Sequence, residues 1–139
     1  MKLYKNYGIS GQETLSLPND LQWKDEFSWT AAEHKKSYTL TGAMIVESAV
    51  KLAGRPIGLE APTDDMAWVP RTTVETLYLW AGAANTVYRL VFEYPDDTRY
   101  FDVIFNQESG RAVEASTVIG IPGHTPSSWF KVKLNFVQV

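Results

Sequence analysis

The stretch Thr86–Phe105, TVYRLVFEYPDDTRYFDVIF, decides the fold of this chain. Large apolar side chains occupy every second position before Pro95-Asp96-Asp97, a triplet of turn-forming residues. Alternation at every second residue is typical of a strand with one buried face. The stretch therefore predicts an antiparallel hairpin, and one face of its first half carries Tyr88, Leu90, Phe92 and Tyr94.

The segment before this hairpin, RTTVETLYLWAGAAN (71–85), has the period of an α-helix. Its apolar residues at i, i+3, i+4 and i+7 form one stripe, made of Val74, Leu77, Tyr78 and Ala81. Thr72 and Glu75 have the spacing of a capping box, in which hydroxyl and carboxylate each bind a free backbone amide. We therefore predict one helix at about residues 72–82.

The C-terminal third supplies two more strands. The first is AVEASTVIGIP (112–122), which we expect to end at Pro122-Gly123. The second is SSWFKVKLNFVQV (127–139), in which Phe130, Val132, Leu134 and Phe136 alternate with polar residues. The order of strands, one helix and strands predicts a mainly β fold. We expect an antiparallel β-sandwich or split barrel with one packed α-helix.

Upstream of the helix, VKLAGRPIGLEAP (50–62) interrupts an apolar stretch with a turn. Gly54 supplies backbone freedom, and Pro56 has no N–H to offer a sheet. The segment before it (37–54) is predicted as one long strand, and PIGLEA (56–61) as the edge strand that returns from it. LQWKDEFSW (21–29) is predicted as a bulged or irregular strand.

The 139 residues fit a single domain, 1–139. Residues 1–14 contain Gly8 and Gly11 without a clear period, and we predict a flexible or exchanged N-terminal arm there. The N-terminus lacks the apolar stretch of a secretion signal, and no apolar run reaches the roughly 18 residues that a membrane span needs. We therefore expect synthesis in a cytoplasm.

Composition excludes several kinds of chemistry. Cysteine is absent, so disulfides, thiolate metal sites and cysteine nucleophiles are excluded. The net charge of −3 weighs against a nucleic-acid-binding face, because such faces are usually basic.

The residues that could carry catalysis do not form a recognisable motif. His34 lies in the polar stretch AAEHKKS (31–37), predicted as a solvated loop, and His124 lies among turn formers. Neither has the spacing of a zinc site. The acidic pairs Asp64-Asp65 and Asp96-Asp97 adjoin prolines and are interpreted as turns. We predict no enzyme activity, no cofactor and no metal.

Tryptophans can serve as sugar platforms, as interface residues or as core residues. Trp23 and Trp29 flank the charged residues 24–26, and Trp129 follows a loop rich in turn formers. These three positions are therefore candidates for exposed rings, while core packing is the commoner role.

The phrase LAGRPIGLEAPTDDMAWVPRTTVETLYLWA (52–81) resembles a recurring pattern in small tail proteins of tailed bacteriophages and prophages. The pattern has a Gly-Arg-Pro-Ile turn and strand, a loop, an aromatic step, a helix and a charged hairpin. Pro70 departs from a plain helix start, and the N-terminal third has no match. The resemblance covers about half the chain, residues 43–105, and rests on Gly54, Arg55, Pro56, Ile57, Leu59, Trp68, Val69, Arg71, Leu77, Arg99, Val103 and Phe105.

The resemblance implies a tail-tip or baseplate component similar to distal tail proteins, with a tail-tube-like fold. Such a protein is structural and forms a ring, a hexamer by resemblance, that joins the tail tube to the hub or host-recognition parts. Its partners are further copies and tail tube and hub proteins, with no nucleic acid and no membrane. It is made in the host bacterial cytoplasm and resides in the virion tail. The candidate structural or interface residues are Gly54, Arg55, Pro56, Trp68, Arg71, Trp23, Trp29 and Trp129.

Two other functions stay open at the level of sequence. One is a carbohydrate-binding β-sandwich module that uses Trp23, Trp29 or Trp129 as a stacking platform. The other is a small hydrolase that uses His124 and an acidic residue.

Overall fold

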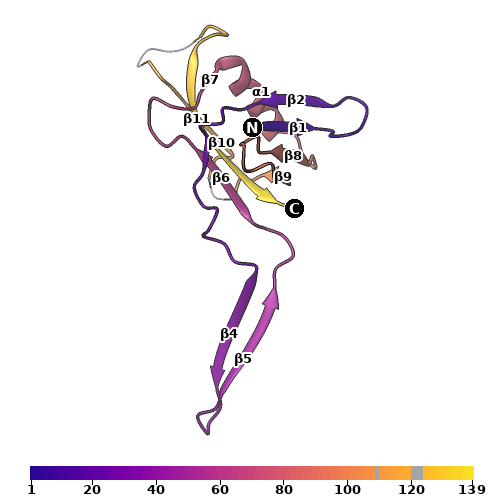
Figure 1. Ribbon diagram of the computed structural model, residues 1–139, viewed down its shortest axis with the longest axis vertical. Helices are drawn as coiled ribbons and strands as arrows, with labels where there is room; N and C mark the ends of the chain where they lie inside the picture. The colour runs from indigo at the N-terminus through magenta and orange to yellow at the C-terminus, as the bar shows by residue number, and fades with distance from the viewer. Residues whose placement is uncertain (109, 120–123) are drawn as a thin grey trace.

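The computed structural model describes residues 1–108, 110–119 and 124–139. These residues form eleven strands and one helix (Figure 1). In chain order the elements are β1 (Lys2–Lys5), β2 (Glu13–Ser16), β3 (Gln22–Trp23), β4 (Ala32–Tyr38), β5 (Met44–Val50), β6 (Pro56–Glu60), β7 (Trp68–Pro70), α1 (Arg71–Ala81), β8 (Tyr88–Val91), β9 (Tyr100–Phe105), β10 (Val113–Thr117) and β11 (Trp129–Gln138).

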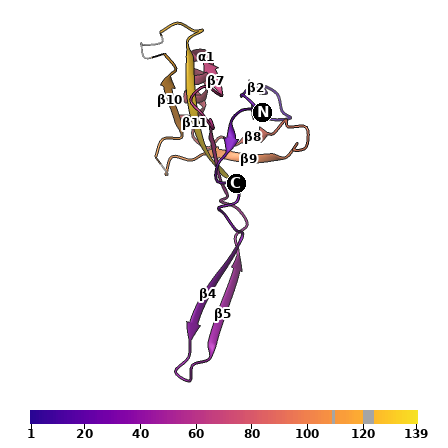
Figure 2. The same ribbon diagram turned by 60° about the vertical axis from the view of Figure 1, so that its left-hand side comes forward.

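Nine strands form the sheet of the body, in the order β2-β1-β8-β9-β11-β6-β3, with β10 and β7 also paired to β11. All of these pairs are antiparallel. The sheet folds over, and Figure 2 shows β8 and β9 running across the direction of β10 and β11. Trp23 of β3 accordingly stacks on Phe92 beyond β8, with ring centroids 5.8 Å apart. The predicted mainly β, antiparallel fold with one helix is confirmed.

Strand β11 forms the centre of the body. It pairs with β7 and then β6 along one edge, and with β10 and then β9 along the other. The alternation predicted from its sequence holds, because Val132, Leu134 and Phe136 are buried. The predicted hairpin of β8 and β9 is also present, in register from Tyr88↔Val103 to Val91↔Tyr100.

The helix lies where it was predicted, but its start and its buried stripe differ. It begins at Arg71 after Pro70, without a side-chain cap, so the predicted capping box is wrong. Glu75 instead accepts a hydrogen bond from Arg71 Nε at 2.9 Å. Leu77 and Trp80 are the buried residues of the helix, whereas Tyr78 is 74% exposed.

The segment 37–54 is two strands and not one. Residues 39–43 form a turn between β4 and β5, because Gly42 adopts a positive φ of 87° that reverses the chain. The stretch AAEHKKS (31–37), predicted as a solvated loop, is exposed but lies mostly in β4. The predicted return strand, β6, pairs with β3 and β11 and has no pairing with β5.

The N-terminal residues lie in the sheet of their own chain. β1 pairs with β2 on one side and β8 on the other, and Met1 and Leu3 are buried. The amino group of Met1 donates hydrogen bonds to Asn19 and to Glu93. Met1–Lys5 therefore do not form the flexible arm expected for residues 1–14.

Two other predicted strands end differently. The irregular strand of residues 21–29 is reduced to β3, Gln22–Trp23, and is followed by a turn. β10 ends at Thr117, and its predicted stop at Pro122-Gly123 lies outside the described residues.

Candidate functional site

The most distinctive surface of the molecule is a hairpin, β4–β5, that projects away from the body (Figures 1 and 2). Seven residues of each strand pair, from Ala32↔Val50 to Tyr38↔Met44. Every residue of both strands is exposed. At roughly 3.3 Å per residue, strands of seven residues extend about 23 Å. Residues 32–50 are called the arm below.

The turn at the tip of the arm is closed by hydrogen bonds within residues 39–43. The Thr39 amide donates to the Ala43 carbonyl at 2.8 Å, and the Gly42 amide donates to the Thr39 carbonyl at 3.0 Å. The Thr39 hydroxyl accepts a third bond from the Ala43 amide at 3.1 Å. This network fixes the strand register and leaves the Leu40 side chain fully exposed at the tip.

The two faces of the arm differ in chemistry. Paired residues point to the same side of a hairpin, so the register assigns each side chain to a face. One face, called the apolar face, carries Tyr38, Met44, Val46 and Val50 beside Ala32, His34, Lys36 and Ser48. The other face, called the charged face, carries Glu33, Lys35, Ser37, Ile45, Glu47 and Ala49.

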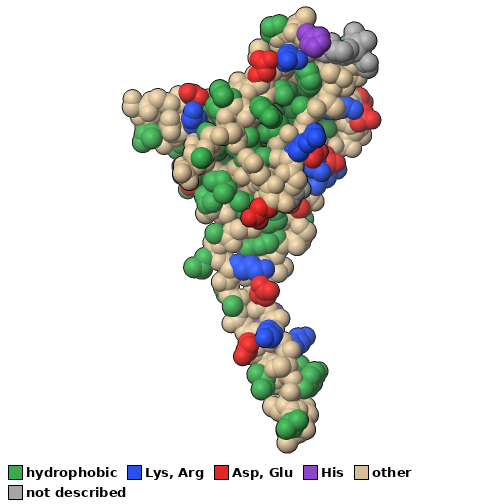
Figure 3. All heavy atoms as spheres, turned by 180° about the vertical axis from the view of Figure 1, so that it is seen from behind, with side chains coloured by type: hydrophobic (Ala, Val, Ile, Leu, Met, Phe, Trp, Pro, Cys, Tyr) green, Lys and Arg blue, Asp and Glu red, His purple; other side chains and the backbone are tan. Residues whose placement is uncertain are grey.

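The apolar face is not covered by any described part of the chain, and its Tyr38 and Val50 are 73% and 68% exposed. Hydrophobic side chains are visible on the outside of the arm in Figure 3. A two-stranded hairpin with no packed face is only marginally stable in water. Contiguous exposed apolar side chains mark surfaces that bind a partner. The arm therefore has the features of an interaction element.

Arg55 anchors the base of the arm. Its guanidinium carbon lies 4.5 Å from the ring centroid of Trp23 and 6.0 Å from that of Trp29. Its Nη2 donates a hydrogen bond of 2.7 Å to the Glu26 carbonyl. Cation–π contact and a charge-assisted hydrogen bond thus attach the start of β6 to the loop that leads into β4.

Two further bonds attach the same loop to the body. Asp25 Oδ1 accepts a bond of 2.8 Å from the Gly58 amide in β6. Arg99 donates from Nη2 to Glu26 Oε1 at 2.6 Å and to Asp97 Oδ2 at 2.7 Å. Hydrogen bonding with Arg99 lowers the pKa of Asp97, and hydrogen bonding with Asp97 and Glu26 raises the pKa of Arg99. Strand β4 of the arm therefore begins after a loop that these hydrogen bonds hold against the body.

Gly54 and Pro56 guide the chain from the arm back into the sheet. Gly54 has a φ of +94°, which is strained for any residue with a side chain, and its amide donates to the Gln138 carbonyl at 2.9 Å. The Gln138 amide returns a bond of 2.9 Å to the Arg55 carbonyl. Pro56 then opens β6, opposite Val137 of β11.

Removal of the Arg55 side chain should loosen the attachment of the arm to the body and lower the stability of the fold. We expect Arg55→Ala to lower the free energy of unfolding by about 2 kcal/mol, because a charged hydrogen bond and its packing on Trp23 are lost. Chemical denaturation followed by tryptophan fluorescence measures the change. Lys51→Ala is the matched control, since its ion pair with Glu33 is solvent-exposed and should contribute less than about 1 kcal/mol. Equal losses in the two variants would refute the anchoring role.

A second group of candidates lies at β7, at the start of α1 and at the start of β11. β7 pairs with the start of β11, which places Pro70 opposite Trp129 and Trp68 opposite Lys131. Trp129 is half exposed, and the Trp68 indole N–H donates to the Asp64 carbonyl at 3.0 Å. Arg71 follows directly in α1.

The eight candidates from the sequence thus separate into two places. Trp23, Trp29, Gly54, Arg55 and Pro56 lie at the base of the arm, whereas Trp68, Trp129 and Arg71 lie at the β7–β11 end. Trp23 has Arg55 on its ring and stacks on the core, so it is not a free sugar platform. The residues of the arm itself were missed, although turn signals at Thr41-Gly42 could have indicated the hairpin.

The histidines lie in exposed positions. His34 Nδ1 shares a hydrogen bond of 2.8 Å with the Ser48 hydroxyl across the arm, and His124 is exposed near β11. Within residues 1–108, 110–119 and 124–139, no three His, Asp or Glu side chains gather closely enough to hold a metal ion. In the same ranges, no helix has the length and apolar character needed to cross a membrane.

Comparison of the chain with protein-family models, with curated proteins and with solved structures found no match.

Proposed function

We propose that this chain is a non-enzymatic structural component of a phage tail tip or baseplate. It assembles with copies of itself into a ring, and the ring joins the tail tube to the hub or host-recognition parts. The proposal combines the Gly-Arg-Pro sequence pattern with one structural observation, the exposed arm.

The arm supports assembly because its exposed apolar side chains gain stability only when a partner covers them. Burying a side chain such as Val46, Val50 or Met44 contributes about 1.5–3 kcal/mol relative to leaving it exposed. The anchored base directs this surface away from the body, where a neighbouring molecule can reach it (Figure 1).

A projecting arm that binds a different surface of the next copy is also compatible with a ring. The arm and the surface that it covers are different parts of the molecule, so the contact is heterologous, and heterologous contacts close into rings when the rotation per subunit permits. A ring of six follows from the resemblance to distal tail proteins. Tail tube and hub proteins are the proposed partners at the two ends of the ring, and the virion tail is the proposed location.

Mass measurement at increasing protein concentration tests the proposal. We expect static light scattering to report a rise from the single-chain mass to a fixed multiple of it, and electron micrographs of that fraction to show rings. A chain that stays monomeric at every concentration, and that binds neither a tail tube protein nor a hub protein in a mixture, would contradict the proposal.

A further inference from the structure

The outer edge of β10 is open. The Asn135 amide donates to the Ala112 carbonyl at 2.9 Å, and the Val118 amide donates to the Trp129 carbonyl at 3.3 Å. The backbone N–H and C=O groups of the even-numbered residues in 112–118 therefore point toward β11. Backbone groups alternate in direction along an antiparallel strand. The N–H and C=O groups of Val113, Ala115 and Thr117 therefore point away from β11. In the part of the chain that the structure describes, β10 pairs with β11 alone.

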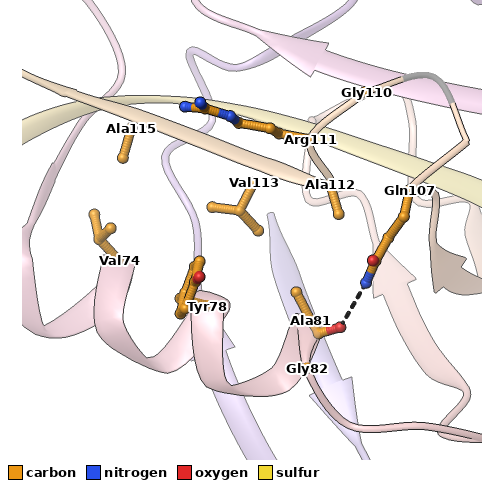
Figure 4. Close-up of a pocket in the computed structure, with 10 residues that line it drawn as sticks. All are labelled: Val74, Tyr78, Ala81, Gly82, Gln107, Gly110, Arg111, Ala112, Val113 and Ala115. Carbon is orange, nitrogen blue, oxygen red and sulfur yellow. Dashed lines mark hydrogen bonds between the residues drawn. The ribbon is translucent and has the colours of Figure 1, made fainter.

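A groove of about 730 Å³ runs between this strand and α1. Figure 4 shows Val74 and Tyr78 of the helix extending toward the strand, and Val113 and Ala112 extending toward the helix. The lining combines apolar side chains of the helix and the strand with the polar Gln107 and Arg111, and Gln107 limits one end by donating a hydrogen bond of 3.0 Å to the Ala81 carbonyl. An extended segment laid along β10 would bind its backbone to the open edge and place every second side chain in the groove.

We propose that β5 of one copy adds to the β10 edge of the next copy, with Met44, Val46 and Val50 in the groove beside α1. This inference rests on the proposed assembly and identifies the two surfaces that meet. Both are incomplete in the single chain, because the edge of β5 away from β4 is unpaired and its apolar face is uncovered.

Side-chain direction fits this pairing in one orientation. On β10, Val113 and Ala115 pair with the buried Leu134 and Val132, so their side chains lie on the core side. Glu114 lies on the other side, opposite Lys133.

Arg111 lines both the groove and a second hollow on that outer side, in which Lys131 and Lys133 already pair with Asp64 and Glu60. When the apolar residues of β5 enter the groove, Glu47 of β5 falls on this outer side, where Arg111 is among the lining residues. Neither Glu47 nor Arg111 forms an ion pair within the described residues, so each is free to pair across the contact. The reverse orientation would turn Met44, Val46 and Val50 away from the groove and leave their side chains exposed to water, so their burial would be lost.

The other open edges of the body fit less well. β2, Glu13–Ser16, is mostly polar, with Leu15 as its one large apolar side chain. β3 is a strand of two residues and β7 a strand of three. β10 offers five residues to the seven of β5, together with a groove, lined in part by Val74, Ala112 and Val113, that can receive side chains.

Disulfide trapping tests the pairing, and the absence of native cysteine makes the result unambiguous. A Val46→Cys chain is mixed with a chain carrying one cysteine on the receiving edge, in three separate mixtures with Val113→Cys, Ala115→Cys or Thr117→Cys. Neighbouring strands place cysteine Cα atoms within about 6 Å, the range of a disulfide. After mild oxidation we expect one or two of the mixtures to give a disulfide-linked pair of unlike chains in high yield.

Glu47→Cys is the matched control, because it is the next residue of β5 and points to the opposite face. Its yield with the same three edge variants should be at least tenfold lower. If Val46→Cys cross-links only to itself, or equally with Glu47→Cys, while the mixture still assembles, the β10 edge is not the receiver and the proposed assembly stands. If the unmodified chain never exceeds the single-chain mass, the pairing and the assembly both fail.

Discussion

Replacing residues 32–50 by a short Gly-Ser linker should abolish assembly and leave the body folded. The arm contributes no buried residue to the core, so its loss removes little stability from the body. Its two ends are already adjacent, because the Lys51 amide donates to the Ala31 carbonyl at 2.8 Å, and a short linker can join them. Circular dichroism should report an unchanged melting midpoint within a few degrees, and light scattering should report the single-chain mass at every concentration.

A second pair of variants separates the chemistry of the arm from its length. Joint replacement of Met44, Val46 and Val50 by Ser keeps the arm but removes its apolar surface, and should also prevent assembly. The joint replacement Glu33→Gln and Lys35→Gln alters only the charged face, and should leave the assembled mass unchanged. An arm-deleted chain that assembles as the full chain does, or a body that unfolds without the arm, would contradict this account.

Phe136→Ala should destabilise the chain more than any single change on the arm. Phe136 is buried at the point where β11 pairs with both β6 and β9, and its ring centroid lies 4.8 Å from that of Phe105. Truncating a buried Phe costs about 3–5 kcal/mol, which is a large part of a typical stability of roughly 5–15 kcal/mol. Urea denaturation should show a correspondingly lower midpoint.

Ile9→Ala is the control for this substitution, because Ile9 is 65% exposed and lies outside every proposed contact. A surface change of this kind should alter the free energy of unfolding by less than about 0.5 kcal/mol. A similar loss for Phe136→Ala and Ile9→Ala would show that the core is not centred on β11.

The strands that were predicted correctly are those whose apolar side chains are buried by other parts of the same chain. In β11 and β8, buried and less buried side chains alternate, because one face of each strand lies on the core and the other is nearer to water. This alternation appears in the sequence as an apolar residue at every second position. The helix was predicted in the same way, from apolar residues that recur with the helical period. Its buried stripe was misjudged at Tyr78 and Trp80, because the ring of Tyr88 in β8 stacks on Trp80, and the period of the helix alone does not show which of its faces packs on that strand.

The arm could not be predicted in the same way. Met44, Ile45 and Val46 are apolar on both faces, which is typical of a strand inside a core, yet all three are exposed in the single chain. Their pattern reflects a partner that is not part of one chain, if the proposed assembly is correct. The sequence pattern did indicate Arg55 as a candidate, but its contacts with Trp23 and Glu26 depend on a loop from a distant segment.

The central claim is that assembly covers the arm, and hydrogen–deuterium exchange tests it most directly. Exchange of peptides spanning residues 44–50 is measured in the unmodified chain at low and at high concentration, with peptides from β11 as an internal reference. The account predicts that the arm amides exchange rapidly in dilute protein and become at least tenfold slower in the assembled fraction, while β11 changes little. An assembled fraction whose arm amides exchange as fast as those of the single chain would contradict it.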